Sequence, residues 1–140
     1  MITAIDTNAI IALWDADQTL SSAAQNSLDA AFHRGSLVIS APVFAELVAA
    51  PRRTEAFVAT FLEETGITVD WELGEPVWRS AARAFQGYAD RRRKQRDSGP
   101  RRILADFLIG AHAAVNGYRL LTLDDRLYQT SFPSLTIETF

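Results

Sequence analysis

The sequence predicts a three-layer α/β/α sandwich with a mostly parallel central sheet, built as a single domain over residues 1–140. Three observations predict this class. Short apolar segments alternate with longer segments that carry apolar residues at helical spacing, which is typical of a parallel sheet covered by helices. The chain has 140 residues, the usual size of one domain. Its hydrophobic fraction of 48% is sufficient for a packed core.

Five apolar segments are expected to be strands. Residues 2–5 (ITAI) are short and continuously apolar, as in a strand that is buried on both faces. The other strands are expected at 37–40, 67–71 and 118–123, with a short last strand at 135–138.

Capping residues and glycines mark the expected helices. Asn8 is the expected N-cap of the first helix and Ser21 or Ser22 that of the second, while Pro42 suits the first turn of a third. Gly35 and Gly117 follow helical segments as C-caps. The helices are expected at 8–13, 21–33, 42–50, 52–65, 75–93 and 103–116, with one helical turn at 125–129.

Composition excludes several classes of site. The chain has no cysteine, which rules out disulfides, thiolate metal sites and cysteine nucleophiles. No apolar run reaches the roughly 18 residues of a membrane span, and no basic segment precedes the first apolar stretch as in a signal peptide. We therefore expect a cytoplasmic protein without a membrane segment. The two histidines, His33 and His112, are too few for a His-rich metal site and are expected to be structural.

The positive charge is concentrated in one segment. The net charge is -3, yet residues 91–102 hold seven of the 14 basic residues. Such a run is ordinarily a solvated face, and the alternative is local contact with the phosphates of a nucleic acid. The seven residues are Arg91, Arg92, Arg93, Lys94, Arg96, Arg101 and Arg102.

Four acidic residues, far apart in the sequence, are expected at one edge of the sheet. Asp6 and Asp124 end the first and fourth strands, and ligands of open parallel sheets bind beyond the carboxyl ends of strands that flank the reversal of strand order. Glu46 lies one turn into the helix after the second strand. Asp106 lies in the first turn of the helix that leads back to the fourth strand.

The surroundings of these acids favour a metal site. Glu46 and Asp106 each lie alone within an apolar segment, and no basic residue is adjacent to Asp6 or Glu46. A hard cation such as Mg²⁺ or Mn²⁺ would offset their repulsion. Each acid also has a simpler interpretation: Asp6 or Asp124 as a helix cap, Asp106 as a partner of the helix dipole, Glu46 as a partner of an arginine.

Four segments together resemble a PIN-domain ribonuclease, specifically a VapC-type toxin. They are IDTNAIIAL, ISAPVFAELV, ILADFLIGAHAAVNGYRLLTLDDRLY and LTIE, and they span nearly the whole chain. The resemblance implies a metal-dependent endoribonuclease whose catalytic and metal-binding acids are Asp6, Glu46, Asp106 and Asp124. It leaves Asp125 open as an alternative to Asp124, and it implies that Thr7, Asn8 and Thr122 orient the acids.

The resemblance also implies partners and a mechanism. The expected partners are an RNA substrate (tRNA or ribosomal RNA), a second copy of the chain, and a VapB-like antitoxin that carries a DNA-binding end. One or two Mg²⁺ or Mn²⁺ ions would be held mainly by Asp6 and Asp106, with Asp124 binding directly or through water and Glu46 holding a second ion or orienting water. The alternatives are a housekeeping RNA-processing PIN protein, a phosphatase, a DNA nuclease, or a non-catalytic interaction module.

Overall fold

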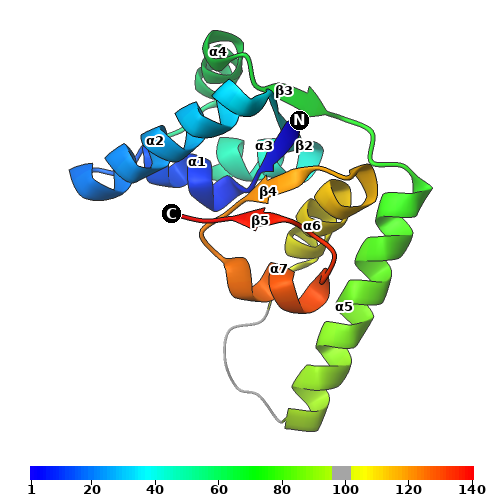
Figure 1. The fold of residues 1–140 in the computed structure, drawn as a ribbon. Coiled ribbons are helices and arrows are strands. Elements are labelled where there is room, and N and C mark those ends of the chain that lie inside the picture. Colours follow the sequence, from blue (N-terminus) through cyan, green and yellow to red (C-terminus); the bar gives the residue numbers. More distant parts are fainter. Residues whose placement is uncertain (96–101) are drawn as a thin grey trace.

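A computed structural model describes residues 1–95 and 102–140 of the chain. Its centre is a five-stranded sheet in which every pairing is parallel, in the order β3-β2-β1-β4-β5 (Figure 1). This confirms the predicted α/β class. The strands are β1 (Ile2–Ile5), β2 (Ser36–Ser40), β3 (Thr68–Asp70), β4 (Arg119–Leu121) and β5 (Ile137–Glu138).

Helices cover both faces of this sheet and complete the three layers (Figure 1). Their order along the chain places one or two helices between successive strands, as parallel pairing requires. Within the described residues, no helix is both long and apolar enough to cross a membrane. The helices are α1 (Thr7–Leu13), α2 (Gln18–Arg34), α3 (Ala41–Ala49), α4 (Glu55–Thr65), α5 (Glu75–Gln95), α6 (Leu104–Asn116) and α7 (Asp125–Ser131).

The strand order reverses between β1 and β4, as the sequence predicted. β1 pairs with β2 on one side and with β4 on the other, where Ile5 is aligned with Leu121. The pairing continues one residue further, because the backbone N–H of Asp6 donates to the Leu121 carbonyl at 2.9 Å. Asp6 therefore lies at the carboxyl edge of the reversal point.

The core fixes α6 against the sheet. Residues 107–113 of this helix are all buried, and Phe107 and Ile109 are among the largest fully buried side chains. Burial of each such side chain stabilises the fold by roughly 1.5–3 kcal/mol relative to leaving it in water. The N-terminal turn of α6, with Asp106, is thereby held at the carboxyl edge of the sheet.

Two of the expected helix caps are wrong. The N-cap of α1 is Asp6 and not Asn8, because the Asp6 carboxylate accepts from the Thr7 N–H at 2.7 Å. The N-cap of α2 is Asp17 and not Ser21 or Ser22, since its carboxylate accepts from the backbone N–H groups of the first turn. In both helices an aspartate upstream of the expected cap begins the helix, and the residues chosen from sequence lie inside it.

Other expected boundaries also shift. α4 begins at Glu55 and not at residue 52, because Arg52 has a left-handed backbone (φ 64°) and Thr54 caps the helix. α5 continues to Gln95, so residues 91–94 lie on a helix. α7 runs to Ser131, beyond the single turn expected.

Candidate active site

A pocket of about 430 Å³ opens at the carboxyl edge between β1 and β4. All four acids predicted from sequence line it, which confirms that the fold brings them to one edge. The lining residues are Asp6, Thr7, Asn8, Ile11, Ala12, Asp15, Leu20, Glu46, Arg102, Asp106, Leu123, Asp124 and Tyr128. We call this the acidic pocket.

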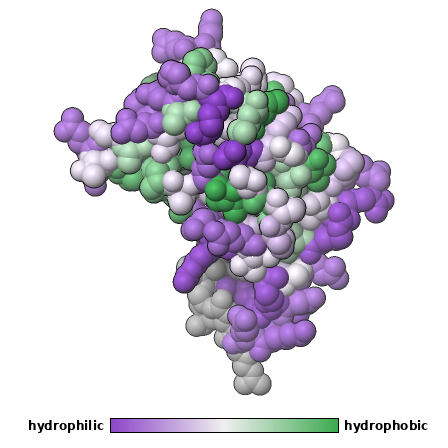
Figure 2. Space-filling view, viewed as in Figure 1, coloured by the Kyte–Doolittle hydropathy of each residue, from purple (hydrophilic) through white to green (hydrophobic). Residues whose placement is uncertain are grey.

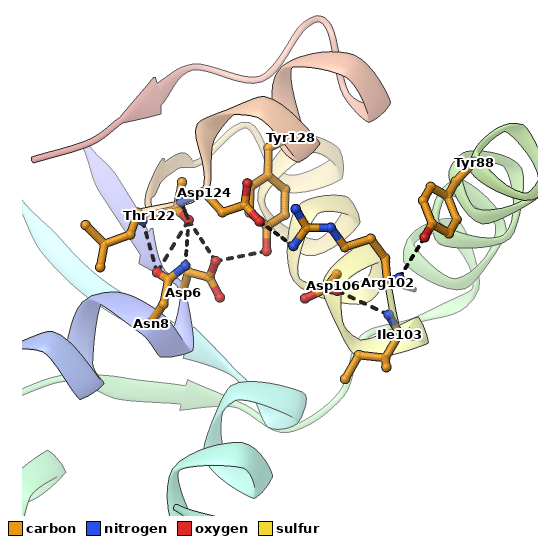
Figure 3. Close-up of polar contacts among 10 residues, drawn as sticks. Asp6, Asn8, Tyr88, Arg102, Ile103, Asp106, Thr122, Asp124 and Tyr128 are labelled. Carbon is orange, nitrogen blue, oxygen red and sulfur yellow. Dashed lines mark hydrogen bonds and ion pairs between the residues drawn. The ribbon is translucent and has the colours of Figure 1, made fainter. Parts of the chain in front are cut away.

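Asp6 is the most buried of the four acids, with 5% of its surface exposed. Its Oδ1 accepts from the Thr7 N–H at 2.7 Å, which caps α1. Its Oδ2 accepts from two hydroxyls, Thr122 Oγ1 at 2.8 Å and Tyr128 Oη at 3.0 Å (Figure 3). The strand behind, the helix ahead and two hydroxyls beside it thus fix this carboxylate.

Burial raises the pKa of Asp6 to about 6 from its ordinary value of 3.8. The hydrogen bonds from Thr122, Tyr128 and Thr7 stabilise the carboxylate and lower the pKa, while the nearby charge of Asp106 raises it. The neutral donors therefore offset only part of the cost of removing this charge from water.

Asp124 is held at the pocket by its backbone. Its N–H donates to Thr122 Oγ1 at 2.9 Å, and the preceding Leu123 N–H donates to Asn8 Oδ1 at 3.0 Å. Thr122 thus contacts both Asp6 and Asp124, while Asn8 holds the turn after β4 and makes no hydrogen bond to Asp6. Asp124 precedes α7 and makes no side-chain capping hydrogen bond, and it lines the pocket.

Glu46 reaches the pocket from α3 and is half-buried. Its Oε1 accepts from Thr7 Oγ1 at 2.6 Å, which ties α3 to the start of α1. Thr7 therefore contacts two of the four acids, through its backbone to Asp6 and through its side chain to Glu46. The second carboxylate oxygen of Glu46, Oε2, is the one left for a water or an ion.

Asp106 lies in the first turn of α6, where it caps the helix. Its Oδ2 accepts from the Ile103 N–H at 3.2 Å. Burial raises the pKa of Asp106, against the Ile103 hydrogen bond and the positive charge of Arg102, while the charge of Asp124 raises it further. Asp106 therefore both stabilises the N-terminal turn of α6 and lines the acidic pocket, so the two roles considered from the sequence are compatible.

Comparison with known proteins assigns the family. The model of the PIN domain family matches residues 3–133. The chain belongs to the PIN-domain family. A search of curated proteins by sequence finds no match.

Solved structures share the fold of this PIN domain. VapBC2 from Rickettsia felis, solved with a DNA fragment from its promoter, matches with a TM-score of 0.72 and 18% identity over 100% of this chain and 99% of that chain. VapBC-1 from nontypeable Haemophilus influenzae matches at 0.67 and 20% over 99% and 98%. FitAcB from Neisseria gonorrhoeae matches at 0.60 and 22% over 98% and 96%.

Tyr128 is a residue of the acidic pocket that the sequence did not predict. Its ring lies against α6 at Gly110, where an added Cβ would be 2.3 Å from the ring of Phe132 and 3.0 Å from that of Tyr128. The absence of a side chain at Gly110 lets α7 approach closely enough for the buried Tyr128 hydroxyl to reach Asp6. No local pattern marks Tyr128, because the need of a buried tyrosine hydroxyl for a hydrogen-bond partner becomes evident only once its burial is known.

Arg102, one of the basic residues predicted to bind RNA, reaches into the acidic pocket. Its guanidinium lies 2.5 Å from Asp124 Oδ2, and its backbone N–H donates to Tyr88 Oη at 2.7 Å (Figure 3). Asp125, the alternative fourth acid, is not among the lining residues, and Gln129 approaches it at 3.4 Å.

The remaining basic residues of the predicted RNA-binding segment divide into two groups. Arg91, Arg92, Arg93 and Lys94 lie on the last turns of α5, where Arg93 pairs with Asp90. Arg96 and Arg101 lie outside the described residues.

The donors of the acidic pocket suit a hard divalent cation. All four acids offer carboxylate oxygens, the ligands that Mg²⁺ and Mn²⁺ prefer. As the side chains stand, no three of the described Asp, Glu and His residues are grouped closely enough to surround one ion. One of the four, Asp124, is paired with Arg102.

Proposed function

We propose that this PIN domain is a metal-dependent endoribonuclease that acts as the toxin of a toxin–antitoxin pair. One observation carries the proposal: four carboxylates from separate elements line one pocket, and the most buried of them, Asp6, has no positively charged partner among the described residues. Burying an uncompensated charge is costly. The pocket thus favours a cation taken from solution.

Asp6, Asp106 and Asp124 are the proposed ligands of Mg²⁺ or Mn²⁺. A cation bound there would lower the pKa of a bound water and offset negative charge on the phosphate. Glu46 accepts from Thr7 through one oxygen, which leaves the other to orient the attacking water or to hold a second ion. Thr122 and Tyr128 keep the Asp6 carboxylate in one orientation.

The solved structures with this fold support a role beside an antitoxin. Among them are two VapBC complexes bound to DNA and a toxin–antitoxin complex from Klebsiella pneumoniae. We therefore propose a VapB-like antitoxin as partner, a homodimer as the assembly, the cytoplasm as the location, and tRNA or ribosomal RNA as the substrate. DNA would be bound by the antitoxin end of the complex.

A cleavage assay tests the enzymatic part. The purified chain is incubated with labelled RNA, labelled single-stranded DNA and a small phosphate ester, each with Mn²⁺ or with EDTA. We expect only RNA to be cut, only with the metal, leaving 5′-phosphate and 3′-hydroxyl ends. Cleavage in EDTA, or products ending in a 2′,3′-cyclic phosphate, would contradict the mechanism.

Neighbouring aspartates provide a matched control for the fourth acid. Asp124→Asn removes the carboxylate that lines the pocket, whereas Asp125→Asn makes the same change one residue further along the chain, outside the lining. We expect the first substitution to abolish cleavage and the second to leave it nearly unchanged. The reverse result would assign the fourth acid to Asp125.

A growth assay separates a toxin from a housekeeping RNA-processing enzyme. Induced expression of the chain should arrest growth, and co-expression of a short neighbouring reading frame should restore it. Expression of Asp106→Asn alone, with no antitoxin present, should not arrest growth. If the wild-type chain cuts RNA in vitro yet leaves growth unaffected, the housekeeping alternative is favoured. If neither activity responds to the substitution, the chain is an interaction module.

A further inference from the structure

A second pocket, of about 410 Å³, lies between α5 and α7. Its described lining contains four arginines and no carboxylate. The lining residues are Tyr88, Arg91, Arg92, Gln95, Arg102, Arg126, Leu127, Thr130 and Ser131. We call this the arginine pocket. Figure 2 shows a hydrophilic surface over the projecting end of α5 that Figure 1 places at the bottom of the molecule.

Aromatic packing builds this pocket. The ring of Tyr88 packs against Phe107 of α6 (5.4 Å between centroids), and Phe85 stacks on the same Phe107 at 4.9 Å. The Tyr88 hydroxyl accepts from the Arg102 N–H at 2.7 Å and lies 3.5 Å from Arg92 Nη1. One wall of the arginine pocket is therefore attached to the core and is not a loosely solvated run of charges.

The arginine pocket adjoins the acidic pocket at Arg102. Arg102 lines both pockets, with its guanidinium on Asp124. Arg126 is two residues beyond Asp124, at the start of α7. A chain that passes from one pocket to the other therefore meets carboxylates first and guanidinium groups next.

The chemistry of the lining suits phosphate. Guanidinium groups bind phosphate oxygens through paired N–H donors, and like charges that share a pocket repel one another until an anion joins them. Arg91 is half-buried and Arg126 is exposed, so their side chains are accessible to a ligand. The exposed hydroxyl of Thr130 adds a further donor.

We infer that the arginine pocket binds a backbone phosphate of the RNA, next to the phosphate that is cleaved in the acidic pocket. The inference rests on the proposed ribonuclease function and deepens it. It extends the predicted basic segment with Arg126, which lies outside that segment in the sequence and inside the same pocket in space.

Salt dependence of RNA binding tests the inference without cleavage. The parent is Asp6→Asn, bound to a fluorescent single-stranded 12-nucleotide RNA at several NaCl concentrations. Each lost phosphate contact on a single strand flattens the plot of log K against log[salt] by about 0.7. We expect Arg91→Gln/Arg126→Gln to flatten the slope by about 1.4. Arg91→Lys/Arg126→Lys, which retains the charge, should keep most of the salt dependence.

Arg79→Gln is the matched control on the same helix. Arg79 lies twelve residues before Arg91, roughly 18 Å along α5, in an exposed pair with Glu75. Arg79→Gln should leave the slope of log K against log[salt] unchanged. An unchanged slope in Arg91→Gln/Arg126→Gln, or an equal loss in Arg79→Gln, would overturn the arginine pocket even if the wild-type chain cuts RNA. Absence of RNA binding in every folded variant, together with absence of cleavage by the wild-type chain, would overturn the ribonuclease proposal as well.

A neutral linkage in the RNA tests the adjacency. Single methylphosphonates are placed at successive positions around the mapped cleavage site. The linkage next to the cleaved one should weaken binding to the parent and have no further effect on Arg91→Gln/Arg126→Gln, since both changes remove the same contact. Independent effects at every position near the cleavage site would overturn the placement.

Discussion

Asp6 and Asp70 lie at the ends of parallel strands at the same edge of the sheet, and their carboxylates differ in the groups that contact them. Asp70 is the last residue of β3, and its Oδ2 lies 2.7 Å from His112 Nε2. Asp6 follows β1 and accepts only from one backbone N–H and two hydroxyls among the described residues. One carboxylate has a titratable nitrogen beside it, and the other has none.

The difference separates a structural acid from an acid that is available for chemistry. His112 is 2% exposed, and its ring packs edge-on against Tyr118 at 5.5 Å. The pair therefore fastens α6 to the far strand of the sheet, in agreement with the structural role expected for His112. Asp6 lies in the acidic pocket, where a partner from solution can reach it.

Cleavage is where the two aspartates should differ most. Asp6→Asn keeps the shape of the side chain and removes the charge, so we expect RNA cleavage to fall by roughly 10²–10³-fold, the loss seen when a group that stabilises a transition state is removed. Asp70→Asn is the matched control and should retain cleavage within a few-fold. Equal activities of the two variants, measured as initial rates with Mn²⁺, would remove the distinction.

Metal affinity should depend on pH through Asp6. Its pKa of about 6 means that protons compete with Mn²⁺ below that pH, so affinity should weaken by up to about tenfold per pH unit there and level off above it. Titrations followed by the thermal midpoint at pH 5, 6, 7 and 8 measure this. Asp70→Asn should keep the full pH dependence, and Asp6→Asn should reduce it to the part that comes from Asp106. Binding that is equally tight at pH 5 and pH 8 would contradict the role of Asp6.

Stability should move in opposite directions in the two variants. The pKa of Asp6 is raised on folding, so its contribution is most favourable below pH 3.8 and is lost as the pH rises through about 6. The shift of about two units corresponds to roughly 3 kcal/mol in the metal-free protein. At pH 7.5 in EDTA, Asp6→Asn should therefore raise the free energy of unfolding. Asp70→Asn should lower it by about 1–3 kcal/mol, because buried His112 loses its charged partner.

Urea unfolding at pH 4.5 and 7.5 provides the check. The gain from Asp6→Asn should shrink at pH 4.5, where the wild-type carboxyl is protonated in the folded state. A gain of the same size at both pH values would assign the effect to packing instead of charge.

The sequence was sufficient to predict the positions of the four acids. Each position follows from a local pattern, namely a strand end or the first turn of a helix, and parallel pairing then brings those ends to one edge. Asp6 and Asp124 became neighbours because β1 pairs with β4. The same patterns gave strand positions well and helix starts poorly, since Asp6 and Asp17 compete with nearby Asn8 and Ser21 as caps.

These local patterns could not predict which side chains pair with one another. The Arg102–Asp124 and Asp70–His112 pairs join residues 22 and 42 positions apart, and no local periodicity selects one partner over another. The sequence likewise does not show that Gly110 is the position on α6 against which the rings of α7 pack. The acidic pocket was thus predictable as a set of acids, and its arginine, its tyrosine and its structural counterpart at β3 required the tertiary packing.

Tyr128→Phe should produce the smallest change and the most specific one. It removes only the hydroxyl that donates to Asp6 Oδ2 at 3.0 Å, so the carboxylate loses one stabilising hydrogen bond while its burial stays the same. That bond lowers the pKa of Asp6, so its loss should move the pH midpoint of Mn²⁺ binding upward from about 6, by up to about one unit. Tyr118→Phe removes a hydroxyl from the ring beside His112 and should leave the midpoint in place. A lower cleavage rate in Tyr128→Phe with an unmoved midpoint would mean that the hydroxyl serves the substrate and not Asp6.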